Sequence, residues 1–362
     1  MAQSAPRTTN VDDTPMTGVV ANELFRRAEA AAAEGQYEEA GEHYERLLRA
    51  GVEPGLMLYR LGVIANARGL YDEAWEYHNE AIRQNPGLAA RISPEGAKHH
   101  DLVCRGPYDQ EEPTSCPICG HTGCEPMQVI NCLAWPTYHP ALAPVRRWMR
   151  CDDCGHGFVS PRPTQAALSR LYEDTPPDTL LAVDYFHLSR YSDIVHRFWE
   201  LMPGGDLLDI GSAQCYMCAV AMDFGYNAVA MDLVPLYAEY ARRAGCDFIQ
   251  GDVATYDFAD RQFDIVTAGD IIEHVLDPVA VVRRMAALLK PSGLLWLSTP
   301  NHEGAWTRLA RDKDPMWAES EHVQFFSLRS LKRLLADCGL TVVDYRMSQN
   351  WMGCGQVLAR FL

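Results

Sequence analysis

Two short cysteine pairs could bind a metal because of their spacing. CPICG spans residues 116–120 and CDDCG spans residues 151–155, so each pair is separated by two residues and followed by a glycine. Such a turn aims two thiolates at one point, and the glycine permits the left-handed backbone that these turns often need. Two such turns supply four sulfur ligands in a tetrahedron, which suits zinc. We therefore predict a structural zinc site formed by Cys116, Cys119, Cys151 and Cys154.

Other readings of these cysteines are weaker. One pair alone would equally suit a redox dithiol, and the 31 residues between Cys119 and Cys151 exceed the usual zinc-ribbon spacing, so an inserted loop is expected. A closed four-sulfur shell leaves no open position for catalysis, so the role of the metal would be folding. Nearby residues that rank lower as ligands are Cys124, Cys132, His121 and His156.

A second set of candidate residues follows strand-like segments in the C-terminal half. Gly211 comes directly after an apolar run in LLDIGSAQC, where a glycine lets the backbone approach a ligand closely. Asp232 ends the next run, and an acidic residue there can accept both hydroxyls of a ribose. Asp252 follows the third run, where it would contact an adenine. The G-x-G-x-x-G pattern of a dehydrogenase is not offered.

The segments that must position these residues alternate between strand and helix patterns. DLLDIG, NAVAMDL, FDIVTAGD and GLLWLSTP have the character of buried strands. CAVAMDFG, PLYAEYARRAG and PVAVVRRMAALLKPSG have helical patterns that end at glycine or proline. This alternation predicts a doubly wound α/β sheet, with ligands beyond the carboxyl ends of its strands.

An internal repeat occupies the N-terminal part of the chain. EGQYEEAGEHYERLL, from Glu34, aligns with RGLYDEAWEYHNEAI, from Arg68, at an offset of 34 residues, the tetratricopeptide period. About two such repeats are expected over residues 20–88, with a further helix to about residue 104. An ordinary helical bundle is the alternative. The repeats would bind a peptide or protein partner, pack on the rest of the chain, or mediate self-association, and all three remain open. The residues expected in the packed seam are Tyr37, Ala40, Tyr71 and Ala74.

Composition and charge narrow the function classes. The net charge of −16 opposes tight binding to nucleic acid, which needs clustered lysines and arginines. No stretch approaches the roughly 20 apolar residues of a membrane span, and the polar N-terminus lacks a signal-peptide core. We expect a cytoplasmic protein without nucleic-acid or membrane partners. The expected parts are a disordered leader (1–19), helical repeats (20–104), a zinc module (105–162) and an α/β domain (163–362).

The C-terminal part resembles the class I S-adenosylmethionine (SAM)-dependent methyltransferases. Residues 207–233 are similar to their motif I and acidic motif II. Residues 263–301 and 321–340 are similar to later motifs of the branch that includes ubiquinone-type O-methyltransferases and many natural-product enzymes. CDDCGHGFVSPRPT resembles the zinc module that precedes this domain in some bacterial methyltransferases, including sugar C-methyltransferases. The resemblance implies a Rossmann-like seven-stranded domain that binds SAM.

The resemblance also implies which residues bind the cofactor. They are Asp209, Gly211, Ala213, Asp232, Leu233, Asp252, Val253 and Asp270. One position departs from the family's Asp-x-Gly-x-Gly-x-Gly pattern: Cys215 stands in place of the third glycine. Either the loop shifts, or the thiol packs behind it.

The expected chemistry is methyl transfer. The protein must hold a nucleophile in line with the activated methyl of SAM, and a hydroxyl acceptor can also need a base. His322 and His274 are the candidate catalytic residues because histidine titrates near neutrality. For His274, a structural role beside the cofactor is an alternative. An alternative is that a divalent ion binds to Asp270, Glu273 and His274. The expected acceptor is a specialised metabolite, a sugar or a biosynthetic peptide, with O-methylation favoured. The alternative function is a SAM sensor or scaffold whose repeats bind a protein partner, without catalysis.

Overall fold

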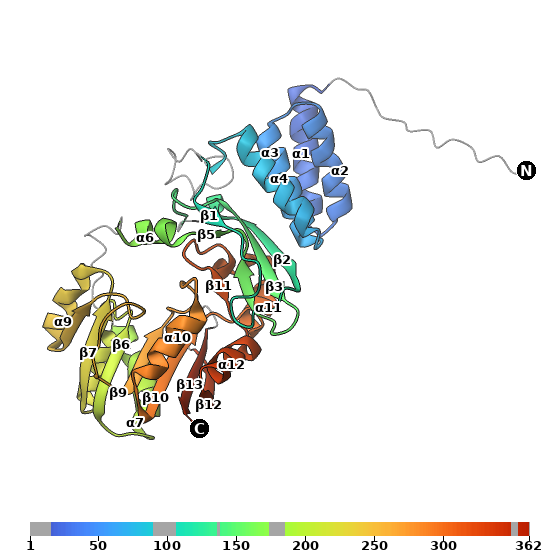
Figure 1. Cartoon of the computed structure of the whole chain (residues 1–362). Coiled ribbons are helices and arrows are strands. Elements are labelled where there is room, and N and C mark those ends of the chain that lie inside the picture. Colours follow the sequence, from blue (N-terminus) through green and yellow to red (C-terminus); the bar gives the residue numbers. More distant parts are fainter. Residues whose placement is uncertain (1–15, 90–105, 136–137, 174–184, 349–353, 362) are drawn as a thin grey trace, which may run out of the picture.

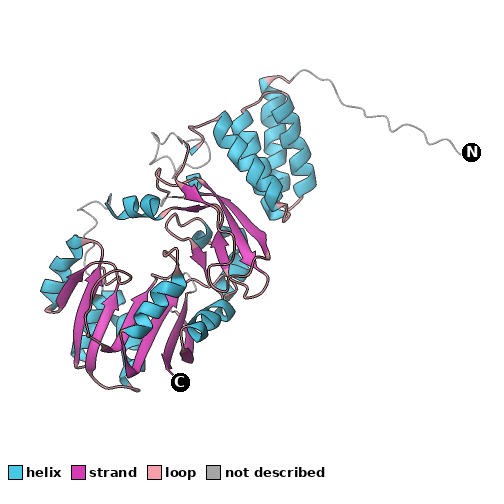
Figure 2. Cartoon of the chain, in the orientation of Figure 1, coloured by secondary structure: helices cyan, strands magenta, loops and turns pink. Residues whose placement is uncertain are grey.

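The structure is a computed structural model that describes residues 16–89, 106–135, 138–173, 185–348 and 354–361 (Figure 1). Most of the predicted leader, and residues 90–104 with the further helix expected there, lie outside the described residues. Along the chain come four helices, a small antiparallel sheet and a large mixed sheet flanked by helices (Figure 2). No helix among the described residues is both long and apolar enough to cross a bilayer.

The N-terminal part consists of two helical hairpins, which confirms the predicted helical segment. Gly35 and Gly69 turn the chain within each hairpin with nearly equal positive φ angles of 78° and 76°. Ala40 and Ala74 are fully buried where the helices of each hairpin meet. The first helix begins at Gly18, inside the predicted leader, because Thr17 caps it with its hydroxyl. The helices are α1 (Gly18–Ala33), α2 (Tyr37–Arg49), α3 (Pro54–Ala67) and α4 (Tyr71–Gln84).

The helical hairpins pack on the small sheet through α3 and α4. The Asn66 side-chain oxygen accepts a hydrogen bond from the Val129 N–H at 2.8 Å. The Arg147 guanidinium lies 5.2 Å from the centre of the Trp75 ring. The surface that α3 and α4 turn toward the small sheet is therefore covered by that sheet.

The small sheet takes its edge strand from a distant part of the chain. Its order is β11-β4-β3-β2, and all neighbours are antiparallel. Its strands are β2 (Cys124–Asn131), β3 (Val145–Cys151), β4 (Gly157–Val159) and β11 (Gln324–Phe325). A two-stranded sheet of β1 (Gln110–Glu111) and β5 (Arg162–Pro163) lies beside it, and η2 (Cys132–Ala134) follows β2. The predicted boundary at residue 163 falls in β5, and β11 belongs to the predicted α/β domain.

The large sheet has the order β12-β13-β10-β9-β6-β7-β8. Strands β6 to β10 run parallel, and β13 is antiparallel to both of its neighbours, which confirms the expected α/β fold with a mostly parallel sheet. Its strands are β6 (Gly205–Ile210), β7 (Tyr226–Asp232), β8 (Asp247–Gln250), β9 (Phe263–Gly269), β10 (Leu289–Thr299), β12 (Leu340–Met347) and β13 (Gly355–Phe361).

Helices cover both faces of this sheet. The apolar sides of α10 (Pro278–Ala287) and α12 (Leu328–Asp337) form one core with one face. Those of α7 (Tyr185–Trp199), α8 (Tyr216–Asp223) and α9 (Ala238–Ala244) form a second core with the other. The shorter elements are α6 (Gln165–Glu173), α11 (Ala305–Ala310), η4 (Pro235–Tyr237), η5 (Arg311–Lys313) and η6 (Pro315–Trp317).

One predicted helix is shorter than its sequence pattern indicated. The pattern continued to Gly293, but α10 ends at Ala287 and β10 begins at Leu289. Leu289 pairs with Phe263 of β9, and the register then shifts before Leu294. Pairing in the sheet therefore overrides the helical preference of these residues, and the intervening residues bulge from the strand.

Candidate functional site

The loop after β6 is fixed to the end of β7 by the carboxylate of Asp232. The Ala213 N–H donates to Asp232 Oδ2 at 3.0 Å, and the Val234 N–H donates to Asp232 Oδ1 at 2.9 Å. Gly211 has a φ of 71°, and a side chain there would collide with Ile271. The backbone conformation thus favours glycine, and a Cβ would displace the end of the Ile271 side chain, as expected for backbone that approaches a ligand.

Two more carboxylates lie at the same end of the sheet. Asp209, near the end of β6, accepts a hydrogen bond from the Thr267 hydroxyl at 2.7 Å, and burial raises its pKa to about 7. Asp270 follows β9 and accepts a hydrogen bond from the Ser298 hydroxyl at 2.9 Å; burial also raises its pKa. The carboxyl ends of parallel strands lie at one edge of a sheet. Both carboxylates therefore lie at the same edge as Asp232.

The remaining predicted cofactor residues follow β7 and β8. Leu233 is partly exposed, next to Asp232. The Gly251 N–H donates to the Asp232 carbonyl at 3.0 Å, which brings the loop with Asp252 to the same edge. Asp252 is exposed and accepts the Ala254 N–H at 2.8 Å, whereas Val253 is buried.

The sequence left two outcomes open for Cys215: the loop shifts, or the thiol packs behind it. Its φ is 59°, in the region that favours glycine, yet its side chain is fully buried in the core beneath the loop. The thiol donates weakly to the Ala213 carbonyl at 3.6 Å. The thiol therefore packs behind the loop.

The two candidate catalytic histidines face each other. The ring centres of His274 and His322 are 4.8 Å apart and nearly perpendicular. Burial lowers the pKa of His274 to about 4 and the pKa of His322 well below its usual range, and the positive charge of Arg146 adds to both effects. Both imidazoles are therefore neutral near pH 7, the form that accepts a proton.

A buried carboxyl group completes this cluster. Glu273 is fully buried, and burial raises its pKa well above the usual range. One ligand atom each from Glu273, His274 and His322 lies within 4.8 Å of the others. The sequence grouped Glu273 and His274 with Asp270 as alternative ion ligands; the structure puts His322 beside them, while Asp270 bonds to Ser298.

One charged residue near the site was missed from the sequence. Arg190, on α7, acts electrostatically on Asp270 and lowers its pKa against the larger effect of burial. Its guanidinium lies 5.2 Å from the centre of the Tyr191 ring. No motif marks a single arginine on an amphipathic helix, so only the fold could bring it to this edge.

The four cysteines predicted to bind zinc come together in two turns of the same form. In the first cysteine turn (residues 116–121) the Cys116 N–H donates to the His121 carbonyl at 2.8 Å. In the second (residues 151–156) the Cys151 N–H donates to the His156 carbonyl at 2.9 Å. Gly120 has a φ of 71° and Gly155 a φ of 70°, which is the left-handed backbone expected after each pair.

The sulfur positions fit a tetrahedral metal ion. Cys116 Sγ lies 3.6 Å from Cys154 Sγ, and Cys119 Sγ lies 3.6 Å from Cys151 Sγ. All four sulfurs are within 4.8 Å of one another. Four sulfurs at about 2.3 Å from one zinc ion would be roughly 3.8 Å apart. The donor set and its spacing therefore suit zinc without rearrangement.

Three of the four lower-ranked ligands make other contacts. Cys124 donates to the His121 carbonyl at 3.7 Å, and Cys132 is buried in a separate core under the helical hairpins. His156 bonds to Gln324.

Among known protein families, residues 183–345 match the family model of a methyltransferase domain. Ubiquinone biosynthesis O-methyltransferase of Xanthomonas campestris pv. campestris is 36% identical over 116 residues, covering 30% of this chain and 48% of the relative. The enzyme of the same name from Xanthomonas oryzae pv. oryzae has the same identity and coverage. The chain thus spans about half the length of the curated relatives that it matches.

Among solved structures, the Burkholderia thailandensis 1,6-didemethyltoxoflavin-N1-methyltransferase aligns with a TM-score of 0.45 at 20% identity, covering 59% of this chain and 98% of that one. The mitomycin 7-O-methyltransferase aligns with a TM-score of 0.44 at 19% identity, covering 54% and 60%. Residues 183–345 are therefore similar in sequence to a methyltransferase domain, and the curated relatives that match part of the chain are O-methyltransferases.

Proposed function

We propose that this protein transfers a methyl group from SAM to a hydroxyl of an organic acceptor. The observation that carries the proposal is the arrangement at the end of β6 and β7, where the Ala213 N–H donates to the Asp232 carboxylate and the Gly211 N–H donates to the Met231 carbonyl. That carboxylate would accept the ribose hydroxyls of SAM, and Asp252 with Val253 would line the adenine. Arg190 would neutralise the carboxylate of the methionine part.

The histidine pair supplies the acceptor side of the proposed reaction. SAM, when bound, supplies an electrophilic methyl on a positively charged sulfur. As the acceptor oxygen forms its bond to that methyl and the carbon–sulfur bond breaks, the hydroxyl proton passes to a neutral imidazole, His322 or His274. Both rings are neutral at pH 7 and so can accept a proton, although their lowered pKa values also make them weaker bases than an exposed histidine.

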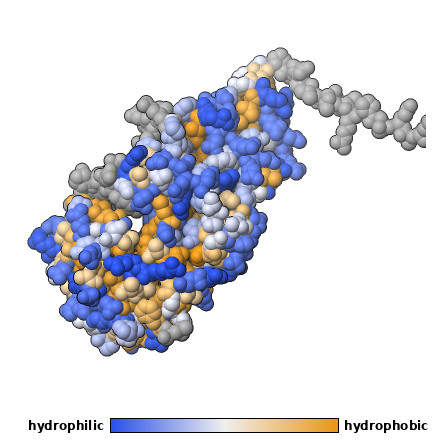
Figure 3. Space-filling view, in the orientation of Figure 1, coloured by the Kyte–Doolittle hydropathy of each residue, from blue (hydrophilic) through white to orange (hydrophobic). Residues whose placement is uncertain are grey.

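The acceptor is proposed to be a specialised metabolite, a sugar or a biosynthetic peptide. Apolar surface gathers near the middle of the face seen in Figure 3, where the methyltransferase region meets the small sheet, while the helical hairpins are mostly polar in this view. Such a surface suits the organic body of an acceptor better than a phosphate backbone, in agreement with the net charge of −16. The O-methyltransferase relatives favour oxygen as the methylated atom.

The four-cysteine cluster is proposed to hold one structural zinc ion. The matched form of the two turns and the sulfur spacing support this proposal. Zinc would fold the module, because a closed four-sulfur shell has no position for substrate.

The helical repeats are proposed to be part of the body of the protein. The contacts of Asn66 and Trp75 with the small sheet support packing on the rest of the chain. Recruitment of substrate would then use the outer surfaces of α1 and α2. Charge reversals at the exposed Arg26 of α1 and Arg49 of α2 test this division without opening the packed core: retained SAM affinity with lost turnover on the native acceptor supports recruitment, and unchanged turnover contradicts it.

Binding and transfer measurements test the function. Titration calorimetry with SAM should give one site per chain, and S-adenosylhomocysteine should form when hydroxyl acceptors of the three classes are added. A protein that binds neither SAM nor S-adenosylhomocysteine would contradict the proposal. SAM binding without transfer to any acceptor would instead favour the SAM sensor that the sequence left as the alternative.

A further inference from the structure

β11 joins the second cysteine turn to the segment that carries His322. β4 follows that turn directly and pairs with β11, and the Val159 N–H donates to the Val323 carbonyl at 3.1 Å. From the other side, the Val323 N–H donates to the Glu273 carbonyl at 2.8 Å, and Glu273 precedes His274. The residue after His322 is therefore held between the turn and the segment of the other histidine.

A side-chain path runs parallel to these backbone bonds. His156 closes the second cysteine turn, and its Nε2 lies 2.8 Å from Gln324 Oε1. Gln324 Nε2 donates to the Val275 carbonyl at 3.0 Å, so Oε1 is the acceptor and His156 Nε2 carries the proton. The path ends on the residue after His274.

Arg146 holds the backbone of His322 directly. It lies on β3, the strand that ends at Cys151, and is buried. Its guanidinium donates to the carbonyls of Glu319 and His322. A strand of the metal-binding module thus contacts the peptide that sets the direction of the His322 ring.

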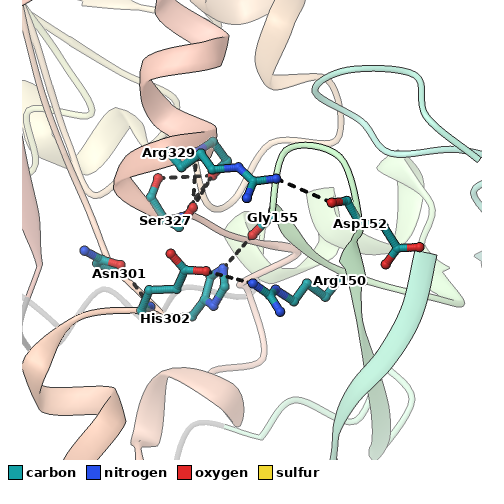
Figure 4. Close-up of polar contacts among 9 residues, drawn as sticks. Arg150, Asp152, Gly155, Asn301, His302, Ser327 and Arg329 are labelled. Atoms are coloured by element: carbon teal, nitrogen blue, oxygen red, sulfur yellow. Dashed lines mark hydrogen bonds and ion pairs between the residues drawn. The ribbon is translucent and has the colours of Figure 1, made fainter. Parts of the chain in front are cut away.

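Contacts outside the histidine pair fix the same turn to the methyltransferase domain (Figure 4). His302, after β10, donates from Nε2 to the Gly155 carbonyl at 3.0 Å, and Arg329 of α12 reaches the Asp152 carbonyl at 3.4 Å. Cys151 also packs in the same core as α10 and α12. The turn is therefore attached to the domain by these side chains as well as through β11.

We propose that the second cysteine turn, held by its metal, positions the His274–His322 pair through Gln324 and Arg146. Gln324 is then a positioning residue of the methyl-transfer site, because its side-chain hydrogen bonds are to His156 and to the Val275 carbonyl. The importance of this positioning for catalysis rests on the proposed methyltransferase function. The coupling itself is a property of the protein alone and is measured without an acceptor. The SAM-binding loop after β6 lies outside this path and should not respond.

Gln324→Leu is the direct test because it breaks both side-chain bonds and leaves all four cysteines in place. The probe is the protein selectively labelled at its 12 histidines, with ring signals assigned through His274→Gln and His322→Gln. We expect the ring signals of both histidines, and their pH dependence, to change. Zinc content should remain, and SAM affinity should stay within roughly twofold of wild type.

Gln128→Leu is the matched control. Gln128 is a buried glutamine on β2 of the same sheet, on a strand that α4 contacts, so the same replacement there should leave both ring signals in place. Unchanged ring signals in Gln324→Leu, or equal changes in both variants, would overturn the proposal. If wild type fails to bind SAM, the proposed function fails instead, and the ring signals still decide the coupling.

Removal of the metal gives a second readout. Stripping zinc with a chelator should change the same two ring signals, and returning zinc should restore them. Ring signals that stay the same in a metal-free protein would contradict the role of the metal. If the stripped protein unfolds, Gln324→Leu remains decisive because it keeps its metal.

Discussion

Replacing Asp232 by alanine separates the two tasks of its carboxylate. In the protein without ligand, the two oxygens accept the N–H groups of Ala213 and Val234 at 3.0 and 2.9 Å. In the proposed complex they also accept the two ribose hydroxyls of SAM. The first pair of bonds affects stability, and the second pair affects affinity.

The magnitude follows from these bonds. A hydrogen bond to a charged group contributes about 1.5–3 kcal/mol. Water can enter the space left by the carboxylate and bond to the hydroxyls, so only part of the ribose contribution is lost. We expect SAM affinity of Asp232→Ala to fall by roughly 10- to 100-fold, at ~1.4 kcal/mol per decade. Its unfolding temperature should also fall, because two backbone N–H groups lose a charged acceptor.

Titration calorimetry with SAM, together with thermal unfolding, measures both effects. Asp206→Ala is the matched control: Asp206 lies at the opposite end of β6, where its carboxylate pairs with Lys290 at 2.9 Å. That variant should bind SAM like wild type. Equal affinity of Asp232→Ala and wild type would mean that the ribose lies elsewhere. Equal losses in both variants would mean that the effect is general destabilisation.

Three further predictions concern other parts of the molecule. Purified protein should contain one zinc ion per chain by elemental analysis, and Cys119→Ser should lose it and unfold the module; less than about half an equivalent in wild type, without chelator, would contradict the site. His322→Ala should lower S-adenosylhomocysteine formation from an accepted hydroxyl substrate with SAM affinity nearly unchanged, whereas equal loss of affinity would place His322 on the cofactor side. Burial lowers the pKa of His78 to about 3, so below pH 6.5 the unfolded chain binds a proton that the folded chain does not, and the free energy of unfolding falls as the pH falls. In denaturant titrations between pH 6 and 4, His78→Gln should reduce the slope of unfolding free energy against pH by about 1.4 kcal/mol per pH unit. An unchanged slope would show that His78 does not cause the pH dependence.

Local patterns predicted the parts of the fold that depend on local sequence. Asp209, Asp232 and Asp270 lie within, at the end of and directly after three apolar runs, so both the strands and their common edge followed from the pattern. The repeat offset of 34 residues correctly marked the two turns at Gly35 and Gly69. The helical pattern failed at Leu289 because a strand partner 26 residues away decides the conformation there.

The connection between the metal-binding module and the methyltransferase region was outside the reach of such patterns. β11 has only two residues, Gln324 and Phe325, and no periodicity can identify so short a strand. Its partner, β4, lies 165 residues or more away in sequence, in a segment that the sequence assigned to another domain. The two modules share this strand, the contacts of the buried Arg146 and part of one core, so a displacement of one against the other would break ladder and guanidinium bonds. The position of His322 is therefore a property of both modules, which explains why sequence motifs identified the histidine but not the residues that hold it.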